Sequence, residues 1–429
     1  MVKGMKLMEI GPLIKLHRIK QNMKQEDLAK GIVSESYLSK IENNKTNANP
    51  KVIDMLCNRL GIKLDDEVSQ SQIIEQCKKW FNLLFEFNDI EEMKRQYQKL
   101  KVLISKNVTP YNTLFEIHKI RYYLLTDDIS KATEQVAKLK ELKATFSEKE
   151  LYYWYKFIGD GLCDLKDYQQ GIHYYKLAEE KLTDLDLPEF EVADLNYQIG
   201  VANNNVRNSM EVIEYINEAL KYYRKYYNLA RCSRGHLLLG IAYRRIYVFD
   251  KAIENFNLAM ELAEINNDEE VTRLIYINLG HLYTAKQEPK QVEYYFQKVL
   301  DDQKATTRQK LISICALSEQ YFFAHEIDKK KEMIQYGLAI LNQESNKEEY
   351  RFFELKLYTY HYAIEEQFDK FESIVMNEFI PFLEQEKDYV GIVTYGKMIG
   401  QYFEDLKKYK YATRYYKLVN TAYEKMIQL

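Results

Sequence analysis

Apolar side chains recur at helical spacing through the first sixty residues and divide them into short amphipathic segments. Leu13 and Leu16 share one face of the first segment, and Ser34 stands at an N-cap position before the third. Pro50 occupies a helix-start position before the fourth, and Ala29 is a small residue where the second and third must approach each other. Four helices are therefore predicted: Ile10 to Ile19, Gln25 to just before Gly31, Glu35 to Glu42, and Lys51 to Leu60.

Two short helices around a tight turn are the arrangement of a helix-turn-helix domain. Charge supports that interpretation, because residues 1–64 hold 12 Lys and Arg against 6 Asp and Glu, whereas the remaining residues hold 49 against 58. A basic head on an acidic body favours nucleic acid as the partner of the head. A plain four-helix scaffold would show a similar periodicity, and the pattern alone leaves that alternative open.

The rest of the chain is a repeat of helix pairs. Gly240 precedes Phe256, and Gly280 precedes Phe296 at the same spacing, so that a small residue lets the two helices of a pair touch. This spacing is that of tetratricopeptide repeats, with longer helices than their consensus. The marker glycines are Gly159, Gly200, Gly240, Gly280 and Gly400.

Units without a marker glycine are inferred from the repeat length. A spacing of about 40 residues centres two of them near Gln320 and Tyr360, with Tyr336-x-x-Ala339 as the second-helix pattern of one. Further units upstream bring the series to about nine. The predicted fold is all-α: a helix-turn-helix head followed by a right-handed superhelix of helical hairpins.

Composition agrees with an all-helical chain, since its 429 residues include only 15 Gly and 6 Pro. The mean hydropathy is −0.48, and the apolar runs are far shorter than the ~20 residues that a membrane span needs. No apolar signal core follows Met1. The 5 Cys are scattered without a CxxC pair, which disfavours a disulfide framework or a zinc site. We expect a cytoplasmic protein with no metal or other cofactor.

The inner face of the first helices in such an array forms a groove suited to an extended peptide. If each small residue is repeat position eight, this face takes positions two, five, six, nine and twelve. Amide side chains there can pair with the main chain of a peptide, although a merely solvated groove is the alternative. The polar residues at these positions include Arg121, Lys156, Asp160, Gln198, Asn204, Arg234, Asn278 and His281.

The head carries Gln25-x-x-Leu28-Ala29, then Ser34 to Asn43 with Leu38 and Ile41 as apolar positions. In order and spacing these residues resemble the lambda-repressor-like (Xre-type) DNA-binding domain. The resemblance implies a domain within residues 1–66 whose helix after the turn enters the major groove. The DNA-binding residues expected from it are Gln25, Ser34, Glu35, Ser36, Tyr37, Lys40, Asn43 and Lys45.

The segment from Arg273 to Tyr283, which continues through Pro289 to Phe296, looks like the repeat of Rap phosphatases that carries a peptide-clamping Asn. Asn278 falls on that Asn, whereas Ala242 stands where a neighbouring Rap unit has another. An Xre-type head on about nine such repeats resembles the RRNPP quorum-sensing receptors, most closely the NprR type, over nearly the whole chain.

This resemblance implies a regulator that binds a short, secreted and re-imported signalling peptide and thereby changes its oligomeric state and its binding to promoter DNA. It also implies homodimers or tetramers and, without peptide, binding to a sporulation phosphorelay response regulator. Within residues 67–429, the expected peptide-binding residues are Arg121, Lys156, Gln198, Asn204, Arg234, Asn278 and His281. Aromatic residues of the last unit predict self-association there: Tyr402, Phe403, Tyr411, Tyr415 and Tyr416.

No enzyme motif is present: the sequence has no Walker loop, GxSxG, HExxH or cluster of His and Cys. We therefore predict no catalytic residue and no metal ligand. The alternative function is a Rap-like inhibitor or phosphatase of a response regulator, in which the helix-turn-helix is secondary. It would need a Gln near the response regulator, for which Gln70, Gln72 and Gln76 are candidates, although this segment is as readily plain surface. A scaffold without DNA function is disfavoured by the head.

Overall fold

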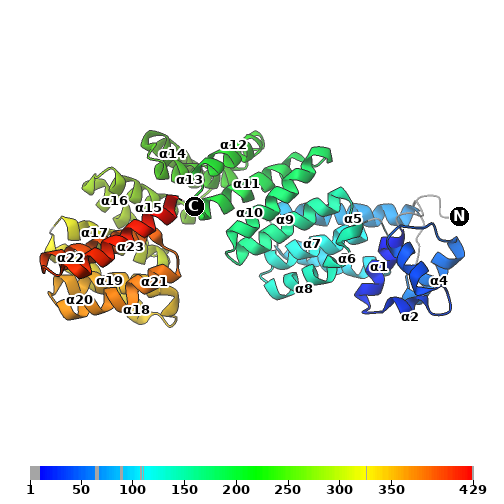
Figure 1. The fold of residues 1–429 in the computed structure, drawn as a ribbon. Helices are drawn as coiled ribbons and strands as arrows, with labels where there is room; N and C mark the ends of the chain where they lie inside the picture. Colours follow the sequence, from blue (N-terminus) through cyan, green and yellow to red (C-terminus); the bar gives the residue numbers. More distant parts are fainter. Residues whose placement is uncertain are drawn as a thin grey trace. The chain divides into compact units, whose positions relative to one another are not determined.

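The computed structural model describes residues 10–62, 67–86, 90–106, 109, 111–324 and 326–427, and every regular element in these ranges is helical (Figure 1). The predicted all-α class is confirmed. The chain forms two compact units, Met1–Arg231 (unit 1) and Cys232–Leu429 (unit 2). In the described ranges, the helices are too short or too polar to cross a bilayer.

The head of unit 1 has the four predicted helices: α1 (Ile10–Lys20), α2 (Gln25–Ala29), α3 (Glu35–Glu42) and α4 (Pro50–Leu60). Ser34 Oγ accepts the backbone N–H of Tyr37, so Ser34 is the N-cap of α3, as predicted. Leu28 and Leu38 are fully buried between the helices. The helix-turn-helix arrangement inferred from periodicity is confirmed.

Nine helix pairs follow within the described residues. The pairs are α5 (Glu67–Glu86) with α6 (Ile90–Lys106), α7 (Asn112–Leu125) with α8 (Ile129–Lys140), α9 (Glu148–Asp164) with α10 (Tyr168–Lys181), α11 (Glu189–Asn205) with α12 (Ser209–Lys225), α13 (Leu229–Arg245) with α14 (Phe249–Ile265), α15 (Glu269–Ala285) with α16 (Pro289–Leu300), α17 (Thr307–Phe323) with α18 (Ile327–Gln343), α19 (Arg351–Ile364) with α20 (Phe368–Ile374), and α22 (Tyr389–Asp405) with α23 (Tyr409–Ile427). A π-helical turn joins α20 to α21 (Ile380–Gln385). The boundary between the units falls in α13, and a division at residue 66 stays a prediction.

The marker glycines lie where the two helices of a pair meet. A β-carbon at Gly240 would come within 2.5 Å of the Phe256 ring, and one at Gly159 within 2.6 Å of the Tyr175 ring. Real β-carbons do not approach other atoms so closely, so these positions require glycine for the observed packing. The prediction that the two helices of a pair approach closely at the small residue is therefore confirmed.

Two units depart from the predicted register. The small residue at the position of the marker glycine is Ser318 in α17 and Thr359 in α19, both fully buried. The centres predicted near Gln320 and Tyr360 lie two residues and one residue too far along the chain, because they extend a constant spacing, whereas Ser318 follows Gly280 after 38 residues.

The second helix of the α17 unit is shifted in the same way. Ile334, 16 residues after Ser318, is 1% exposed, whereas Tyr336 is 40% exposed. The pattern Tyr336-x-x-Ala339 was therefore not the core pattern of this helix. A shift of two residues moves each side chain by about 200° around a helix, and so it changes which residues face inward.

Short turns join the helices through residues with positive φ. After α7, the backbone N–H of Asp127 donates to Leu124 and that of Asp128 donates to Tyr123, which satisfies two carbonyls at the helix end. The left-handed position is occupied by residues other than glycine: Asp127, Lys166, Arg207, Tyr227, Tyr247, Asn267, Gln287, Glu366, Lys387 and Lys407. Each such residue costs about 1 kcal/mol relative to glycine.

Candidate functional site

The outer face of α3 is open to solvent. Glu35, Ser36 and Lys40 are exposed and Tyr37 is half-buried, as is expected of a helix that can enter a DNA groove. Lys45, in the following turn, is also exposed. The structure thus places these predicted DNA-binding residues along one helix and the turn that follows it.

Two other predicted DNA-binding residues are already engaged within the head. Gln25 Nε2 donates to Glu42 Oε2 at 2.7 Å, which orients the amide and leaves its second hydrogen for a phosphate. Asn43 Nδ2 donates to the Ser39 carbonyl at 2.8 Å, and its Oδ1 accepts from Lys15 Nζ at 3.2 Å. Roles of Gln25 and Asn43 at DNA stay predictions.

A buried ion pair in the core of the head joins α3 to α1, and it was not predicted from the sequence. Arg18 Nε and Nη2 donate to the two oxygens of Glu42 at 2.6 and 2.9 Å, and Arg18 Nη1 donates to the Met23 carbonyl. The Glu42 side chain is fully buried. The pair joins α1 to the end of α3, and through Gln25 it also reaches α2. Nothing in the sequence indicated that Arg18 and Glu42, which lie on separate predicted helices, would form a pair.

Unit 2 contains a cavity of about 1140 Å³ lined by residues of α15, α16, α17 and α19. Glu270 and five further residues of α15 line it, and these five occupy repeat positions two, five, six, nine and twelve counted from Gly280. They are Leu274, Ile277, Asn278, His281 and Thr284. The face predicted to line a groove does line a cavity in this unit.

The contributions of α17 and α19 follow the same rule once Ser318 and Thr359 are taken as position eight. Ile312, Cys315, Ala316 and Glu319 face the cavity from α17, and Lys356 faces it from α19. These residues were not predicted from the sequence, because the predicted register was shifted in both units.

The cavity combines amide, charged and apolar groups. Asn278 Nδ2 donates to the Leu274 carbonyl of its own helix at 2.8 Å, so the amide is oriented while Oδ1 is left for a ligand. Desolvation lowers the pKa of His281 to about 3, so this ring is neutral. Lys356 Nζ lies 2.9 Å from Glu319 Oε2, and this carboxylate keeps the pKa of Lys356 raised although burial alone would lower it.

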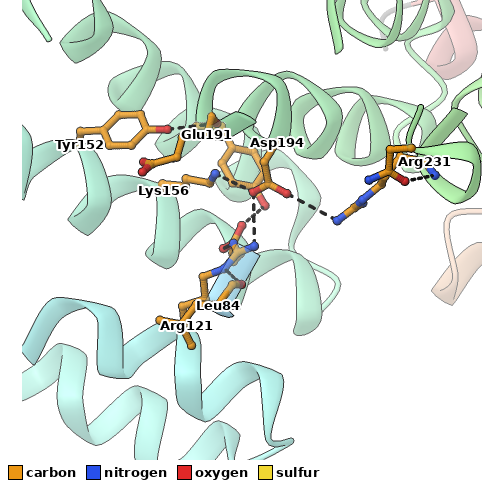
Figure 2. A network of polar contacts seen from close by, with 10 residues as sticks. Leu84, Arg121, Tyr152, Lys156, Glu191, Asp194 and Arg231 are labelled. Atoms are coloured by element: carbon orange, nitrogen blue, oxygen red, sulfur yellow. Dashed lines mark hydrogen bonds and ion pairs between the residues drawn. The ribbon is translucent and has the colours of Figure 1, made fainter. Parts of the chain in front are cut away.

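In unit 1, charged residues of the corresponding face pair with one another (Figure 2). Arg121 Nη1 lies 2.8 Å from Asp160 Oδ2, and Arg121 Nη2 lies 3.3 Å from Asp194 Oδ2. Lys156 Nζ lies 2.6 Å from the same Asp194 oxygen, and Arg231 approaches its other oxygen at 3.6 Å. These four contacts join α7, α9, α11 and α13.

The network is largely buried, and only Arg231 and Asp160 keep part of their side chains exposed. Arg121 is 2% exposed and Lys156 is fully buried. Burial alone would raise the pKa of Asp194, but Lys156 and Arg121 outweigh it and hold that pKa well below its usual range. The charges of Arg121 and Lys156 are thus neutralised by carboxylates of the protein itself. A role of these two residues in peptide binding stays a prediction. Asp194 was missed, although repeat position two counted from Gly200 would have found it.

The remaining predicted peptide-binding residues are not gathered at the cavity. Gln198 and Asn204 are half-buried on α11 in unit 1. Arg234 belongs to unit 2 but is not among the residues that line the cavity, and its Nη2 lies 3.4 Å from Asp268 Oδ2. Of the expected set, the structure brings only Asn278 and His281 together in one cavity.

The residues named for other functions lie as follows. Gln72 and Gln76 are exposed on α5, and the side chain of Gln70 lies outside the described residues. In the last unit, Phe403 and Tyr415 are buried core residues, whereas Tyr411 is 46% exposed. In the described part of the chain, His, Cys, Asp and Glu form no group of three or more that could hold a metal ion.

Comparison with known proteins agrees with this architecture. A helix-turn-helix family model, HTH_3, matches residues 14–66. The chain is 30% identical over 411 residues to the transcriptional activator NprA of Geobacillus stearothermophilus, covering 94% of this chain and 100% of the relative.

Two solved structures share the fold. The apo form of the quorum sensor NprR from B. thuringiensis aligns with a TM-score of 0.70 and 18% identity, over 82% of this chain and 99% of that one. NprR in complex with its cognate peptide NprX aligns with a TM-score of 0.61 and 19% identity, over 82% and 98%. Together with the full-length relative, the basic helix-turn-helix head and the nine helix pairs, these findings show that the chain belongs to the RRNPP family of quorum-sensing regulators, in its NprR-type branch.

Proposed function

We propose that this protein is a transcriptional regulator whose DNA binding through α3 is controlled by a short signalling peptide held in the unit 2 cavity. The observation that carries the proposal is that all five inner-face positions of α15, among them Asn278, line one cavity. The exposed residues of α3 support the DNA-binding half.

The chemistry of the cavity suits an extended peptide. A peptide main chain offers N–H and C=O groups, and the Asn278 amide can accept from one peptide unit through Oδ1. Leu274, Ile312 and Phe353 supply apolar walls for side chains. The Glu319–Lys356 pair provides one charge of each sign for polar ends of the ligand.

Calorimetry of the full chain tests this function. The ligands are synthetic peptides taken from a short open reading frame directly downstream of the gene, with scrambled versions of the same composition as controls. We expect binding of one cognate peptide and a changed affinity for DNA when it is present. Equal binding of cognate and scrambled peptides would contradict the proposal.

We further propose that the protein acts in the cytoplasm as a homo-oligomer and without catalysis. Exposed apolar and aromatic residues of the last pair support self-association, among them Tyr409 at 61% and Tyr411 at 46% exposure. Light scattering should show an assembly larger than a monomer at micromolar concentration, with a stoichiometry that changes on addition of peptide. A monomer under both conditions would contradict this.

Binding to a phosphorelay response regulator in the absence of peptide is a second proposed activity. Its support is the exposure of Gln72 and Gln76 on α5, where they can reach a partner. A pull-down with the purified response regulator, repeated with Gln72→Ala and Gln76→Ala, tests it. If both variants captured the response regulator as strongly as the unmodified chain, Gln72 and Gln76 would have no part in the interaction.

A further inference from the structure

The DNA-binding head of unit 1 is docked on the repeats through α1. In Figure 1, α1 is the head helix that faces the first helix pairs. Lys20 Nζ lies 2.7 Å from Glu116 Oε1 of α7, and the Asn112 amide lies 3.1 Å from His17 Nε2. Lys15 Nζ donates to the Glu141 carbonyl, just after α8, at 3.2 Å. The contacts therefore extend along α1 from Lys15 to Lys20.

Glu116 makes this more than a surface contact. Its side chain is only 3% exposed, and it accepts bonds from Lys119 at 2.7 Å and from Gln135 Nε2 at 2.8 Å as well as from Lys20. Exposed ion pairs contribute little to stability, whereas a buried carboxylate that loses one of its partners destabilises the fold. Removal of the head would take away one of its cations.

The second contact is equally specific. Asn112 Oδ1 accepts from the backbone N–H and the hydroxyl of Thr109 at 2.9 and 2.6 Å. Its NH₂ group must therefore face His17, whose Nε2 accepts. His17 is 3% exposed, and this burial lowers its pKa to about 4, so the ring is neutral. A donor on the repeats, the Asn112 amide, is thus paired with an acceptor on the head, His17 Nε2.

The contact also reaches α3 without covering its exposed face. Lys15 Nζ lies 3.2 Å from Asn43 Oδ1, and Asn43 is the C-cap of α3. Glu35, Ser36 and Lys40 remain exposed while the head is docked. Docking thus fixes the direction of α3 and leaves its outer face available.

We propose that α1 and α7 form a latch that holds the head against the second helix pair, so that the repeats set the orientation of α3. The repeats then control DNA binding through the geometry with which they present the head, and not by covering it. Only the role of α3 in DNA binding rests on the proposed function. The contacts between α1 and α7 exist in the chain without DNA or peptide.

Distance measurements between two spin labels test the latch in the full chain without DNA. One label is placed in the head at Lys30→Cys and one on α8 at Lys138→Cys, both exposed positions. The five native cysteines are buried or half-buried, and the chain without introduced cysteines gives the background. A docked head predicts one narrow distance distribution.

The latch variant is Lys15→Glu with Lys20→Glu, and the matched control is Lys24→Glu with Lys51→Glu, which makes the same charge change at exposed head positions outside α1. We expect the distribution to broaden in the latch variant and to remain narrow in the control, with the helical content unchanged in both. A broad distribution in the labelled chain without charge changes, or equal widths in the two variants, would overturn the proposal. Neither result depends on the proposed peptide or DNA.

Discussion

Phe296 of α16 packs on Gly280 of α15 so closely that a β-carbon at position 280 would lie 2.7 Å from its ring. This contact holds the two helices of one pair together, and α15 supplies six of the residues that line the cavity. The small residue thus positions the face on which the proposed peptide site depends.

Replacement of Gly280 by alanine should destabilise unit 2. The added methyl group has no space beside Phe296, and overpacking of a dense core costs about 1–3 kcal/mol. Urea unfolding followed by circular dichroism measures the change.

Gly161→Ala is the matched control. Gly161 also lies inside a helix, but its β-carbon would meet Leu124 at 3.6 Å, an ordinary contact. Alanine there should raise the free energy of unfolding by about 0.5–1 kcal/mol, because it favours the helix. Equal effects of the two substitutions would contradict the packing argument.

The sequence predicted the helix pairs well wherever a glycine marked the close contact. It failed at Ser318 and Thr359 because a hydroxyl-bearing side chain can also fill a small site, and because the spacing from Gly280 to Ser318 falls short of 40 residues. Glu319 and Lys356 were missed as a consequence, since their place in the cavity follows from that register.

The contacts between charged residues were not predictable in the same way. Arg121 and Asp194 are 73 residues apart and meet because α7 and α11 present the same face. Periodicity places each residue on that face, but it does not show whether a charge will meet solvent, a ligand or another side chain. The pairing of Arg18 with Glu42 in the head has the same origin.

Tyr227→Gly should stabilise the protein. Tyr227 has a φ of 55° and its side chain is 84% exposed, so the substitution relieves backbone strain with little loss of packing. The expected gain in the free energy of unfolding is about 1 kcal/mol. Thermal or urea unfolding measures it, and Tyr227→Ala, which keeps the β-carbon, should show no such gain. A similar gain from both substitutions would mean that the aromatic ring, and not the backbone, carries the cost.

Glu42→Gln should destabilise the head. The substitution leaves the Arg18 guanidinium buried without its carboxylate, and loss of one partner of a buried ion pair costs about 3–5 kcal/mol. Glu35→Gln, on the exposed face of α3, should change stability by no more than about 0.5 kcal/mol. Hydrogen exchange of α1 and α3 is the measurement, and comparable exchange rates in the two variants would count against a structural role of Glu42.

His118 should make stability depend on pH. Its Nδ1–H donates to the Leu114 carbonyl, and its Nε2 is buried without a partner. Desolvation lowers its pKa to about 3 from the ordinary histidine value of 6.5, so the unfolded chain binds the proton first and stability falls as the pH drops from about 6.5 towards 3. Between pH 7 and pH 5 the expected loss is about 2 kcal/mol.

Urea unfolding at the two pH values, in the unmodified chain and in His118→Gln, isolates this contribution. The variant should lack the additional loss of about 2 kcal/mol. The same pH dependence in both proteins would show that His118 is not held neutral in the fold.

The most direct test of the proposed peptide site is calorimetry of Asn278→Ala with the cognate peptide. Loss of the amide should leave a buried peptide group unpaired and weaken binding by about 1–3 kcal/mol, or roughly 5- to 150-fold. Asn217→Ala is the matched control, because Asn217 Nδ2 makes the same bond to a backbone carbonyl four residues earlier, at 2.7 Å, on a helix of unit 1. We predict weaker peptide binding in Asn278→Ala alone, with its melting temperature no lower than that of the control. Unchanged peptide affinity in Asn278→Ala would contradict the account.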